Sequence, residues 1–491
     1  MTQGKCSLRF SLTSGSNYMS SSSKVLRSSL KTFFRTALLT TLFVNLNINL
    51  ASARDESDGD LYEELNVFTD VLAVVQRDYV KPIENKKLVE GAIKGMLATL
   101  DPHSSYLDPD FYKDLQVQTK GEFGGLGIEI TLKEGLLVVV APMEGSPADR
   151  AGVKAGDVIV KIDGKLTKDF SLVDAVKRMR GPKGSAIILS VARRGSPSLL
   201  DFSVVRDNIQ VKSVRSRYIG DGLGYVRLSQ FMERTGDDLK AALEKLDEEG
   251  DGIKGLVLDL RNNPGGLLTQ AVKVSDMFLK DGVIVYTDGR IDSQKQKFYA
   301  HARDTEPDYP VVVIVNGGSA SASEIVAGAL QDAARAIIVG TQTFGKGSVQ
   351  TITPLQNGGA LTLTTALYYT KSGRSIQVTG VKPDIEVAAP IETLNETNVP
   401  QDSTSNEIRE GDLPGAIENP NEGDTGLDVL RQINKTPMQP TSEKYIDPET
   451  ESIESWLGRD PQFGKAVEIL RTFEVGSHIQ ASNSLHSGPL L

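Results

Sequence analysis

The nine residues GTQTFGKGS (340–348) place Lys346 in a glycine-rich turn directly after the apolar run AIIVG. They differ at one position from the phosphate-binding pattern G-x-x-x-x-G-K-[ST], which opens a helix and carries Ser or Thr directly after the lysine. Here Gly347 takes that position, and the following residues, SVQTITPL, have the β-branched, alternating pattern of a strand. Without the hydroxyl, and without a helix N-terminus to face the phosphates, nucleotide binding is disfavoured.

The other chemistry open to Lys346 is that of a general base, which requires a neutral amine near pH 7. Its pKa would have to fall by about three units from about 10.4, a change of roughly 4 kcal/mol that burial without a carboxylate partner can supply. No Asp or Glu occurs between Asp332 and Asp384, so the local sequence offers no ionic partner. A solvated turn lysine remains the alternative interpretation of this segment.

The segment GGSASASE (317–324) offers a nucleophile for such a base. Ser321 is followed by Glu324 at the start of an apolar-periodic run, which is the pattern of a capping box, so Ser321 could simply cap a helix. In the functional interpretation, a hydroxyl at a helix start lies beside unpaired backbone N–H groups that can stabilise an oxyanion. Ser319 and Ser323 are competing candidates that spacing alone does not exclude.

The segment NNPGG (262–266) is a turn, and its glycine amides could supply a second oxyanion donor. A Ser-His-Asp triad has little support, since no histidine is near Ser321 in the sequence, whereas a Ser-Lys pair is a known variant. The histidines are His103, His301, His478 and His486. We find no metal-ligand spacing.

These turns follow strands of one expected sheet. Beyond Asp207 the sequence alternates strand and helix: GLVLDL (255–260), VVVIV (311–315) and AIIVG (336–340) each lead into one of the Gly-rich turns. Such alternation favours right-handed crossovers and a largely parallel sheet. Ligands of such sheets bind beyond the carboxyl ends of the strands, which is where all three turns are expected.

Two parts precede this α/β core. Residues 54–116 are expected to form a helical region, because LNVFTDVLAVVQRDYV and LVEGAIKGMLATL carry apolar faces at three-to-four spacing. Residues 117–206 form a β-rich module, in which short β-type runs alternate with Gly-rich turns around the helical stretch SLVDAVKRM. The expected fold class is therefore a multidomain chain that combines α+β and α/β parts, with the core over residues 207–387.

Two further segments follow the core. Residues 388–445 are rich in Asn, Glu, Pro, Thr, Asp and Ser, which is typical of a flexible, acidic, low-complexity linker. Residues 446–491 are interpreted as a C-terminal tail with one short helix over 461–473. Neither segment shows a pattern that suggests chemistry.

The composition indicates a globular protein with protein or peptide partners. The chain has 491 residues, 39% of them hydrophobic, which is enough to bury ordinary cores. The net charge of −10 disfavours nucleic acid as a partner, because that interaction needs Lys and Arg to neutralise phosphates.

Residues 1–53 are expected to be an export signal peptide. They contain no acidic residue, their run ALLTTLFVNLNINL (37–50) follows a basic region, and they end at the small-x-small pattern ASA. Without their six positive charges the remaining net charge moves from −10 to −16. The basic residues are Lys5, Arg9, Lys24, Arg27, Lys31 and Arg35.

Two alternatives for this N-terminus stay open, a disordered segment and an organellar transit peptide, the latter because the segment is Ser-rich and acid-free. A start at Met19 would give a signal of more ordinary length. Cys6, the one cysteine, lies in the part expected to be removed, so the mature protein would have neither a disulfide nor a thiol nucleophile.

The motifs DLRNNPGG, NGGSASASEIVAGALQD, GTQTFGKGSVQ and GVKPD occur in this order after the β-rich module. Together they closely resemble the carboxy-terminal processing peptidases, also called tail-specific proteases, over about residues 60–387. The resemblance implies a serine endopeptidase in which Ser321 is the nucleophile and Lys346, twenty-five residues later, is the general base. The glutamine that orients the lysine in that family falls on Gln350, which shares a face with Lys346 if the segment is extended.

The same resemblance assigns the oxyanion donors to the amide of Ala322 and to one of the glycine amides of Gly265 and Gly266. It also identifies residues 117–206 as PDZ-like. The loop GGLGI would then bind a peptide's terminal carboxylate through backbone N–H groups while the peptide adds as a strand. Its peptide-binding residues are Gly124, Gly125, Leu126 and Gly127. Arg180 is the candidate for an arginine that relays peptide binding to the active site.

The sequence thus predicts an exported serine endopeptidase that acts on proteins with apolar C-termini and needs no cofactor or metal. The alternative is a catalytically silent PDZ scaffold that only binds peptides. An adaptor protein and a homo-oligomer stay open as partners. The expected location is the bacterial periplasm or inner membrane, with an organellar (thylakoid) lumen as the alternative.

Overall fold

The computed structural model describes residues 56–388, apart from the single residues 134, 144, 169, 251 and 304, together with residues 408–421 and 452–485. The expected signal peptide therefore lies outside the described residues. The chain divides into two units, Met1–Glu90 and Gly91–Leu491. None of the described helices has both the length and the apolarity that a membrane crossing requires.

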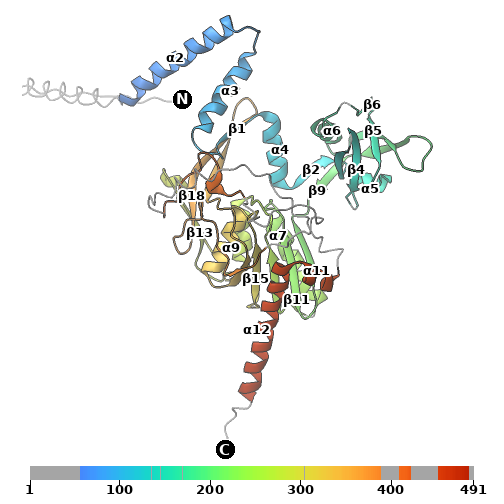
Figure 1. The fold of residues 1–491 in the computed structure, drawn as a ribbon, viewed down its shortest axis with the longest axis vertical. Coiled ribbons are helices and arrows are strands. Elements are labelled where there is room, and N and C mark those ends of the chain that lie inside the picture. Colours follow the sequence, from blue (N-terminus) through green and yellow to red (C-terminus); the bar gives the residue numbers. More distant parts are fainter. Residues whose placement is uncertain are drawn as a thin grey trace, which may run out of the picture. The chain divides into compact units, whose positions relative to one another are not determined.

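The described part of the first unit, residues 56–90, is mainly helical, as expected. Helix α2 spans Glu56–Asp78, and helix α3, Asn85–Ala98, begins in the first unit and ends in the second (Figure 1). Helix α2 carries exposed apolar side chains, among them Leu61, Leu65 and Phe68, at the four-then-three spacing of a helical stripe.

The second unit begins with a short strand and a helix. Strand β1 spans Ser105–Leu107, and helix α4 spans Pro109–Lys120. The Asp108 carboxylate caps α4 by accepting the N–H groups of Asp110 and Phe111, and Pro109 occupies the first helical position, where no N–H is needed. Gly121, in the left-handed region at φ 71°, ends the helix.

The β-rich module is built on an antiparallel sheet with the strand order β3-β4-β5-β7-β8, and β6 pairs with β5. Its core contains Leu137, Val139, Ile159, Leu189 and Val191. The sheet strands and flanking helices are β3 (Ile128–Lys133), β4 (Leu136–Pro142), α5 (Pro147–Ala151), β5 (Val158–Ile162), β6 (Lys165–Leu166), α6 (Leu172–Met179), β7 (Ala186–Ala192) and β8 (Leu200–Val205). A separate pair, β2 (Glu122–Gly125) and β9 (Asp207–Gln210), joins the two ends of the module.

The core contains the expected largely parallel sheet, in the order β10-β11-β12-β15-β16-β19. Only β10 is antiparallel to its neighbour, and the other four pairings are parallel. The strands are β10 (Val214–Tyr218), β11 (Leu223–Leu228), β12 (Gly255–Asp259), β15 (Val311–Val315), β16 (Ala336–Gly340) and β19 (Ile385–Glu386).

Helices cover both faces of this sheet. Leu256, Leu258 and Val313 face α7 (Thr235–Glu249), α8 (Leu268–Asp276) and α9 (Ala322–Asp332), in one apolar cluster. Val257 and Val312 pack on the opposite face against α11 (Ile453–Arg459) and α12 (Pro461–Leu485). Because alternate residues of a strand face opposite sides, strands that are covered on both faces read as continuous apolar runs.

A second sheet, which the sequence did not predict, adjoins the core. It is antiparallel in the order β1-β18-β13-β14, and β17 also pairs with β18. The strands not yet introduced are β13 (Val283–Gly289), β14 (Gln296–Tyr299), β17 (Ser348–Pro354) and β18 (Ala360–Thr370), with the 3-10 turn η1 (Asp292–Gln294) before β14. Strand β17 follows Lys346, as predicted from the SVQTITPL pattern.

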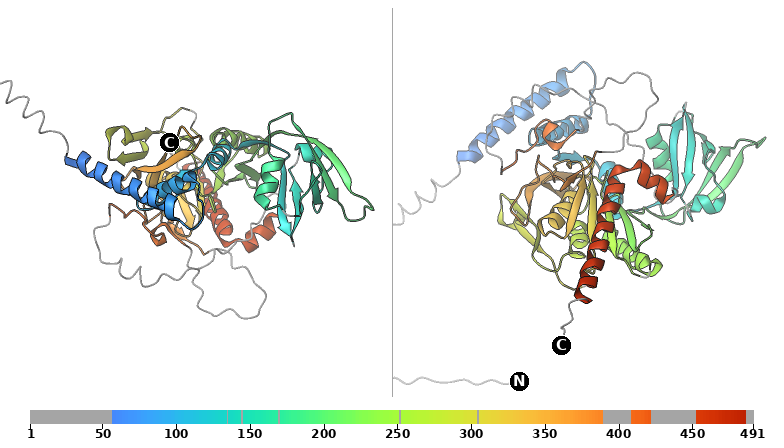
Figure 2. Two further views of the ribbon diagram at one scale, coloured as in Figure 1. Left: turned by 90° about the horizontal axis from the view of Figure 1, so that it is seen from above. Right: turned by 60° about the horizontal axis from the view of Figure 1, so that its bottom comes forward.

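The C-terminal segment differs from the expected tail. Its second helix, α12, starts at Pro461 as expected but continues to Leu485, and it lies against the parallel sheet in the views of Figures 1 and 2. Trp456 and Phe463 stack at 3.7 Å, and the edge of Trp456 meets Tyr225 of β11 at 4.7 Å. An ion pair of 2.8 Å joins Asp460 to Arg261, so these residues belong to the core. The periodicity of the sequence predicted a helix here, but it did not predict the strands against which this helix packs.

The interval expected to be a linker also contains an ordered part. Residues 408–421 include the 3-10 turn η2 (Glu410–Asp412), and the side chain of Glu410 is fully buried.

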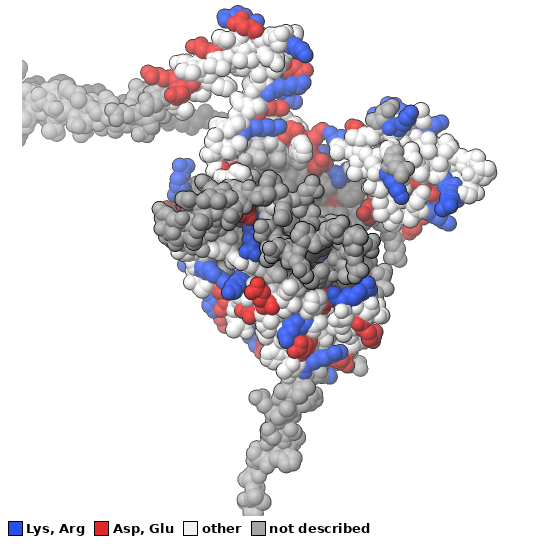
Figure 3. Space-filling model, viewed as in Figure 1, with Lys and Arg blue, Asp and Glu red and all other residues white. Residues whose placement is uncertain are grey.

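On the molecular face shown in Figure 3, Lys and Arg side chains are interspersed with Asp and Glu.

Candidate active site

Ser321 occupies a strained turn between β15 and α9. Its backbone angles are φ 55° and ψ −113°, which a residue with a side chain adopts only at a cost of about 1–3 kcal/mol. Such strain places a nucleophilic serine on a sharp strand-to-helix turn in other hydrolases. Gly265 lies directly beside it, because a Cβ on Gly265 would come within 2.8 Å of the Ser321 Cβ.

The competing serines are engaged elsewhere. The Ser319 hydroxyl donates to the Leu260 carbonyl at 2.8 Å, and the Ser323 hydroxyl donates to the Asn263 carbonyl at 2.9 Å. Both side chains are fully buried, whereas Ser321 is partly exposed. Of the three, Ser321 is therefore the serine that a substrate could reach.

Glu324 joins the serine turn to the lysine turn. Its Oε2 accepts the backbone N–H groups of Ser321 at 2.7 Å and of Lys346 at 2.9 Å. Its Oε1 accepts the Thr343 hydroxyl at 2.5 Å and the Gly345 N–H at 2.7 Å. The capping-box interpretation thus holds for the glutamate, whereas the Ser321 hydroxyl makes no capping hydrogen bond.

Burial raises the pKa of Glu324 to about 7, although its four hydrogen bonds favour the charged form. The carboxyl is fully buried, so no water compensates for a lost partner. The charge state of this group therefore affects both catalytic turns at once.

Lys346 is mostly removed from water, and this burial lowers the pKa of its amine. The negative charges of Glu410, Asp101 and Glu324 act in the opposite direction. None of the described carboxylates lies within ion-pair distance of the amine. The environment therefore favours a neutral lysine more than water does.

The glycines beside Lys346 are required by close backbone approach. Val378 donates its N–H to the Gly345 carbonyl at 2.7 Å, and a Cβ on Gly345 would lie 2.6 Å from the Val378 carbonyl oxygen. The Gly347 N–H donates to Gln377 Oε1 at 2.8 Å, and a Cβ on Gly347 would lie 2.4 Å from the Gln377 nitrogen. The residue that breaks the phosphate-binding pattern is thus the one that lets this turn pack.

Tyr368 was not identified from the sequence. It is fully buried on β18, its hydroxyl donates to the Lys346 carbonyl, and it is in hydrogen-bonding contact with the side chain of Ser321. Burial raises the pKa of Tyr368 well above its usual value, so the phenol stays protonated. No local sequence pattern distinguishes one tyrosine of a strand from another, so Tyr368 could not be identified without the structure.

Gln350, which was expected to orient the Lys346 amine, lies on β17 and has other hydrogen-bond partners in this structure. Its Nε2 donates to Ser348 Oγ at 3.0 Å and to Thr364 Oγ1 at 3.2 Å. Among the described residues, no hydrogen bond joins Gln350 to Lys346. Lys346 lies two residues before the start of β17 at Ser348.

The structure separates the two glycines proposed as oxyanion donors. The N–H of Gly265 donates to Asn263 Oδ1 at 3.0 Å and is thus engaged. The N–H groups of Gly266 and Ala322 meet no acceptor within the described part of the chain. A Cβ on Gly266 would lie 2.2 Å from the Phe231 carbonyl oxygen, so this position requires glycine.

The predicted peptide-binding loop borders an apolar hollow of about 230 Å³ between β3 and α6. Gly125, Leu126 and Gly127 line it together with Arg180, whereas the Gly124 carbonyl is bonded to the Gly181 N–H. Ile128, Ile130, Leu172, Val176 and Met179 supply apolar lining. The arrangement suits an apolar side chain beside free backbone groups.

Arg180 connects this hollow to helix α4. Its guanidinium donates to Asp114 Oδ1 at 2.7 Å and lies 5.0 Å from the centre of the Phe123 ring. Arg180 therefore lines the hollow with one side and contacts a neighbouring element with the other.

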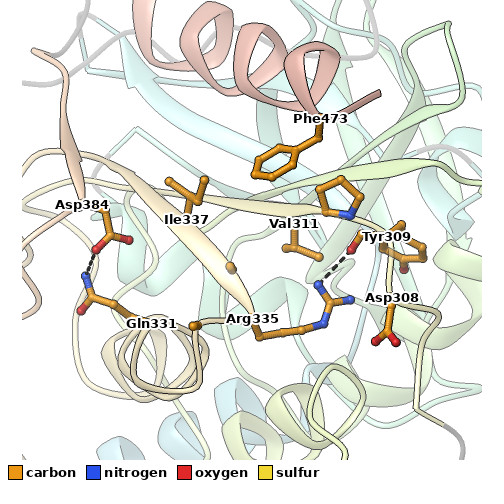
Figure 4. Close-up of a pocket in the computed structure, with 11 residues that line it drawn as sticks. Asp308, Tyr309, Val311, Gln331, Arg335, Ile337, Asp384 and Phe473 are labelled. Carbon is orange, nitrogen blue, oxygen red and sulfur yellow. Dashed lines mark hydrogen bonds between the residues drawn. The ribbon is translucent and has the colours of Figure 1, made fainter. Parts of the chain in front are cut away.

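A larger hollow of about 550 Å³ lies at the other end of the parallel sheet (Figure 4). Val311 and Ile337, near the starts of β15 and β16, line it, so it is remote from the turns that follow these strands. Arg335 there donates to the carbonyls of Phe278 and Tyr309.

No cluster of potential metal ligands occurs among the described residues.

Three family models match the chain. They are described as Peptidase family S41 over residues 222–387, PDZ domain over residues 138–193, and Activating protease CtpB N-terminal domain over residues 29–111. The first covers both catalytic turns, and the second covers most of the β-rich module.

Curated relatives match over most of their length. A "Carboxy-terminal-processing protease" of Bartonella bacilliformis is 50% identical over 398 residues, which is 81% of this chain and 90% of the relative. "Carboxy-terminal processing protease CtpA" of Bacillus subtilis is 35% identical, over 71% of this chain and 74% of the relative. The "Carboxyl-terminal-processing protease" of Synechocystis sp. is 40% identical, over 67% and 78%.

Among solved structures, "Photosystem II D1 C-terminal processing protease" is 32% identical, with a TM-score of 0.40, and the match covers 65% of this chain and 92% of that one. A putative S41 protease from Bacteroides fragilis is 18% identical, also with a TM-score of 0.40, over 65% and 90%.

Proposed function

Because the chain belongs to the carboxy-terminal-processing proteases of peptidase family S41, with a PDZ domain before its catalytic domain, we propose that it is a serine endopeptidase that cleaves through a Ser321–Lys346 pair. The observation that supports this most is the Glu324 carboxylate. It holds the backbone of Ser321 and of Lys346 on one oxygen, although the two residues are far apart in the sequence.

In the proposed mechanism, the Ser321 hydroxyl attacks the scissile carbonyl as neutral Lys346 accepts its proton. The N–H groups of Ala322 and Gly266, which have no other described acceptor, stabilise the oxyanion. The lysine then returns the proton to the leaving amine, and a water molecule hydrolyses the acyl-enzyme on Ser321 with the lysine again as base. Gln350 acts on Lys346 only if it exchanges its present partners for the amine.

Substrate selection is proposed to lie in the PDZ domain. A peptide would add as a strand beside β3 and bind its terminal carboxylate to backbone N–H groups of Gly125 to Gly127. Its last side chain would enter the apolar hollow, so an apolar C-terminus is preferred. A peptide that displaces Arg180 from this hollow would also disturb its contact with Asp114, which gives Arg180 a route to relay binding.

The alternative, a silent peptide-binding scaffold, needs the PDZ hollow but does not explain the second site. Peptide binding by a scaffold requires neither a strained serine nor a lysine turn that packs only with glycines. We therefore place the catalytic function first.

The setting of the protein is also a proposal. The basic N-terminus before the ASA pattern supports export to the periplasm or to the inner membrane surface, with an organellar lumen as the alternative. The stripe on α2 continues as Leu61, Leu65, Phe68, Leu72 and Val75, a heptad-like spacing that supports a homo-oligomer through this helix. The match to an activating protease domain over residues 29–111 supports an adaptor protein as a partner of the same region.

The decisive experiment incubates the purified protein, and separate Ser321→Ala and Lys346→Ala variants, with a protein that bears an apolar C-terminal tag. We expect cleavage only by the unmodified protein, with tag binding retained in both variants. Cleavage by either variant would contradict the pair. Binding of the tag without cleavage by the unmodified protein would favour the scaffold.

A further inference from the structure

The ordered segment 408–421 lies against the lysine turn, although it is separated from the end of the core by residues 389–407. Its Glu410 side chain is fully buried, and Asn419 is 6% exposed. A buried carboxylate is costly unless its partners are well placed. The contacts of Glu410 therefore indicate what this segment is fixed to.

Glu410 reaches both sides of Lys346. Its backbone N–H donates to the Phe344 carbonyl at 3.1 Å, which is two residues before the lysine. Its Oε1 accepts Gln377 Nε2 at 3.0 Å, and Gln377 Oε1 in turn accepts the Gly347 N–H at 2.8 Å. One residue thus holds the turn directly on one side and through one side chain on the other.

The rest of the segment follows the loop that packs under the lysine turn. The Ile417 carbonyl accepts Gln377 Nε2 at 3.0 Å, and Asn419 Nδ2 donates to Thr379 Oγ1 at 3.2 Å. Asn421 Oδ1 accepts the Ser375 N–H at 2.5 Å. The segment is therefore fixed along residues 375–379 by polar contacts at several points.

Glu410 also reaches the loop that supports Gln350. His103 Nε2 lies 2.9 Å from both carboxylate oxygens of Glu410. Two residues earlier, Asp101 accepts the Thr364 hydroxyl at 3.0 Å, and that hydroxyl accepts Gln350 Nε2 at 3.2 Å. The supports of the lysine turn and of Gln350 thus meet in residues 101–104.

We propose that Glu410 is a positioning residue for Lys346, and that residues 408–421 complete the active site from outside the matched peptidase domain. This inference rests on the proposed role of Lys346 as the base. Glu410 does not touch the reacting atoms: it fixes the turn that carries the amine, and it places one negative charge near that amine.

Five titratable groups lie around this turn: Glu410 with its partner His103, Asp101, which accepts the Thr364 hydroxyl, Glu324 from α9, and Tyr368 from β18, which donates to the Lys346 carbonyl. Among the negative charges that raise the pKa of Lys346, and so oppose the effect of burial, that of Glu410 has the largest effect. Replacement of its carboxylate by an amide should therefore make Lys346 easier to deprotonate. The positional and electrostatic effects of Glu410 can be separated by two substitutions.

The test compares Glu410→Gln, which keeps the shape and removes the charge, with Glu410→Ala, which removes both. Glu418→Gln is the matched control, because it makes the same charge change at an exposed position of the same segment. Full-length proteins are assayed with a peptide that ends in apolar residues, and kcat, KM and the pH profile of kcat/KM are measured. Circular dichroism gives the folded fraction of each variant.

We expect Glu410→Ala to lower kcat by about 10²-fold with little change in KM, since a displaced catalytic group costs about that much. Glu410→Gln should retain more kcat than Glu410→Ala, and the acid limb of its kcat/KM profile should move to lower pH. Glu418→Gln should match the unmodified protein in kcat and in the acid limb of the kcat/KM profile.

A kcat of Glu410→Ala that falls only in proportion to the folded fraction would overturn the positioning role, and an acid limb that does not move in Glu410→Gln would overturn the electrostatic effect. Lys346→Met in the same series keeps the two proposals apart. If it still cleaves the peptide, the proposed function fails. If it is inactive while Glu410→Ala has full activity, only the inference on Glu410 fails.

Discussion

The backbone N–H of Lys346 donates to Oε2 of Glu324 at 2.9 Å, so the turn that carries the proposed base is held by a side chain of α9, the helix that begins directly after Ser321. The same oxygen accepts the N–H of Ser321. A buried carboxylate thus links the two turns, in addition to the hydrogen bond from the Phe344 N–H to the Ser319 carbonyl at 3.0 Å, and this relationship gives the first prediction.

Glu324→Gln should reduce kcat by about 10²-fold, because an amide offers one acceptor oxygen where the carboxylate offers two and the turns lose their common anchor. Binding of a C-terminal peptide should be unchanged, since the PDZ domain does not involve this residue. Steady-state kinetics and fluorescence titration with the same peptide check the two parts. Unchanged kcat would show that the turns are held by other contacts.

The pH dependence of activity follows from two groups that act in the same direction. Burial lowers the pKa of Lys346, so the neutral base is present above that lowered pKa and is lost as the pH falls through it. Burial raises the pKa of Glu324 to about 7, so the fully accepting carboxylate is present above about pH 7 and is protonated below it. Activity should therefore rise with pH through neutrality.

A pH profile of kcat/KM with a C-terminal peptide tests this expectation. Activity that is highest in acid and falls as the pH passes about 7 would contradict it. A peptide-binding titration at the same pH values separates loss of chemistry from loss of binding.

The strain at Ser321 predicts a difference between two inactive variants. Ser321→Ala keeps a side chain at φ 55°, whereas Ser321→Gly removes the steric penalty. We expect the glycine variant to be more stable than the alanine variant by about 1 kcal/mol, after the larger chain entropy of unfolded glycine is deducted from the relieved strain. Urea denaturation of both variants measures the difference, and equal midpoints would refute stored strain.

Gly347→Ser would create the complete phosphate-binding pattern, yet it should not bind nucleotide. The new side chain would meet the Gln377 backbone at 2.4 Å, and the turn leads into a strand rather than a helix. We expect loss of peptidase activity and a lower unfolding temperature, without binding of a fluorescent ATP analogue. Gly458→Ser in α11, where nothing lies within 4 Å of the new Cβ, is the control.

The parts of the site that have local patterns could be predicted from the sequence. Ser321 and Lys346 follow apolar strands in Gly-rich turns, and parallel strands bring such turns to one edge. Tyr368 and Glu410 lie far from them in the sequence and have no periodic signature, so only the fold brings them near. Gln350 was assigned from the family resemblance, and its hydrogen bonds to Ser348 and Thr364 come from the pairing of β17 with β18, which has no local signature.

The same contrast between local patterns and contacts of distant residues explains which parts of the fold could be predicted. Alternating strands and helices predicted the parallel sheet, because each unit is local. The antiparallel sheet pairs β13 with β18 across a long stretch of sequence, and the docking of α12 depends on contacts with strands far upstream. Composition suggested a linker around residue 410, since one buried carboxylate does not alter the average polarity of a segment.

The helices α11 and α12 cover one apolar face of the parallel sheet, and they follow every strand of that sheet in the chain. During synthesis on the ribosome, β11, β12 and β15 therefore emerge long before the residues that shield Val257 and Val312. Arg261 pairs with Asp259 from the start, but its second ion pair, with Asp460, forms only when α11 and α12 are made. A nascent chain of this protein therefore completes the packing of its parallel sheet only after the residues of α11 and the first turns of α12 have emerged.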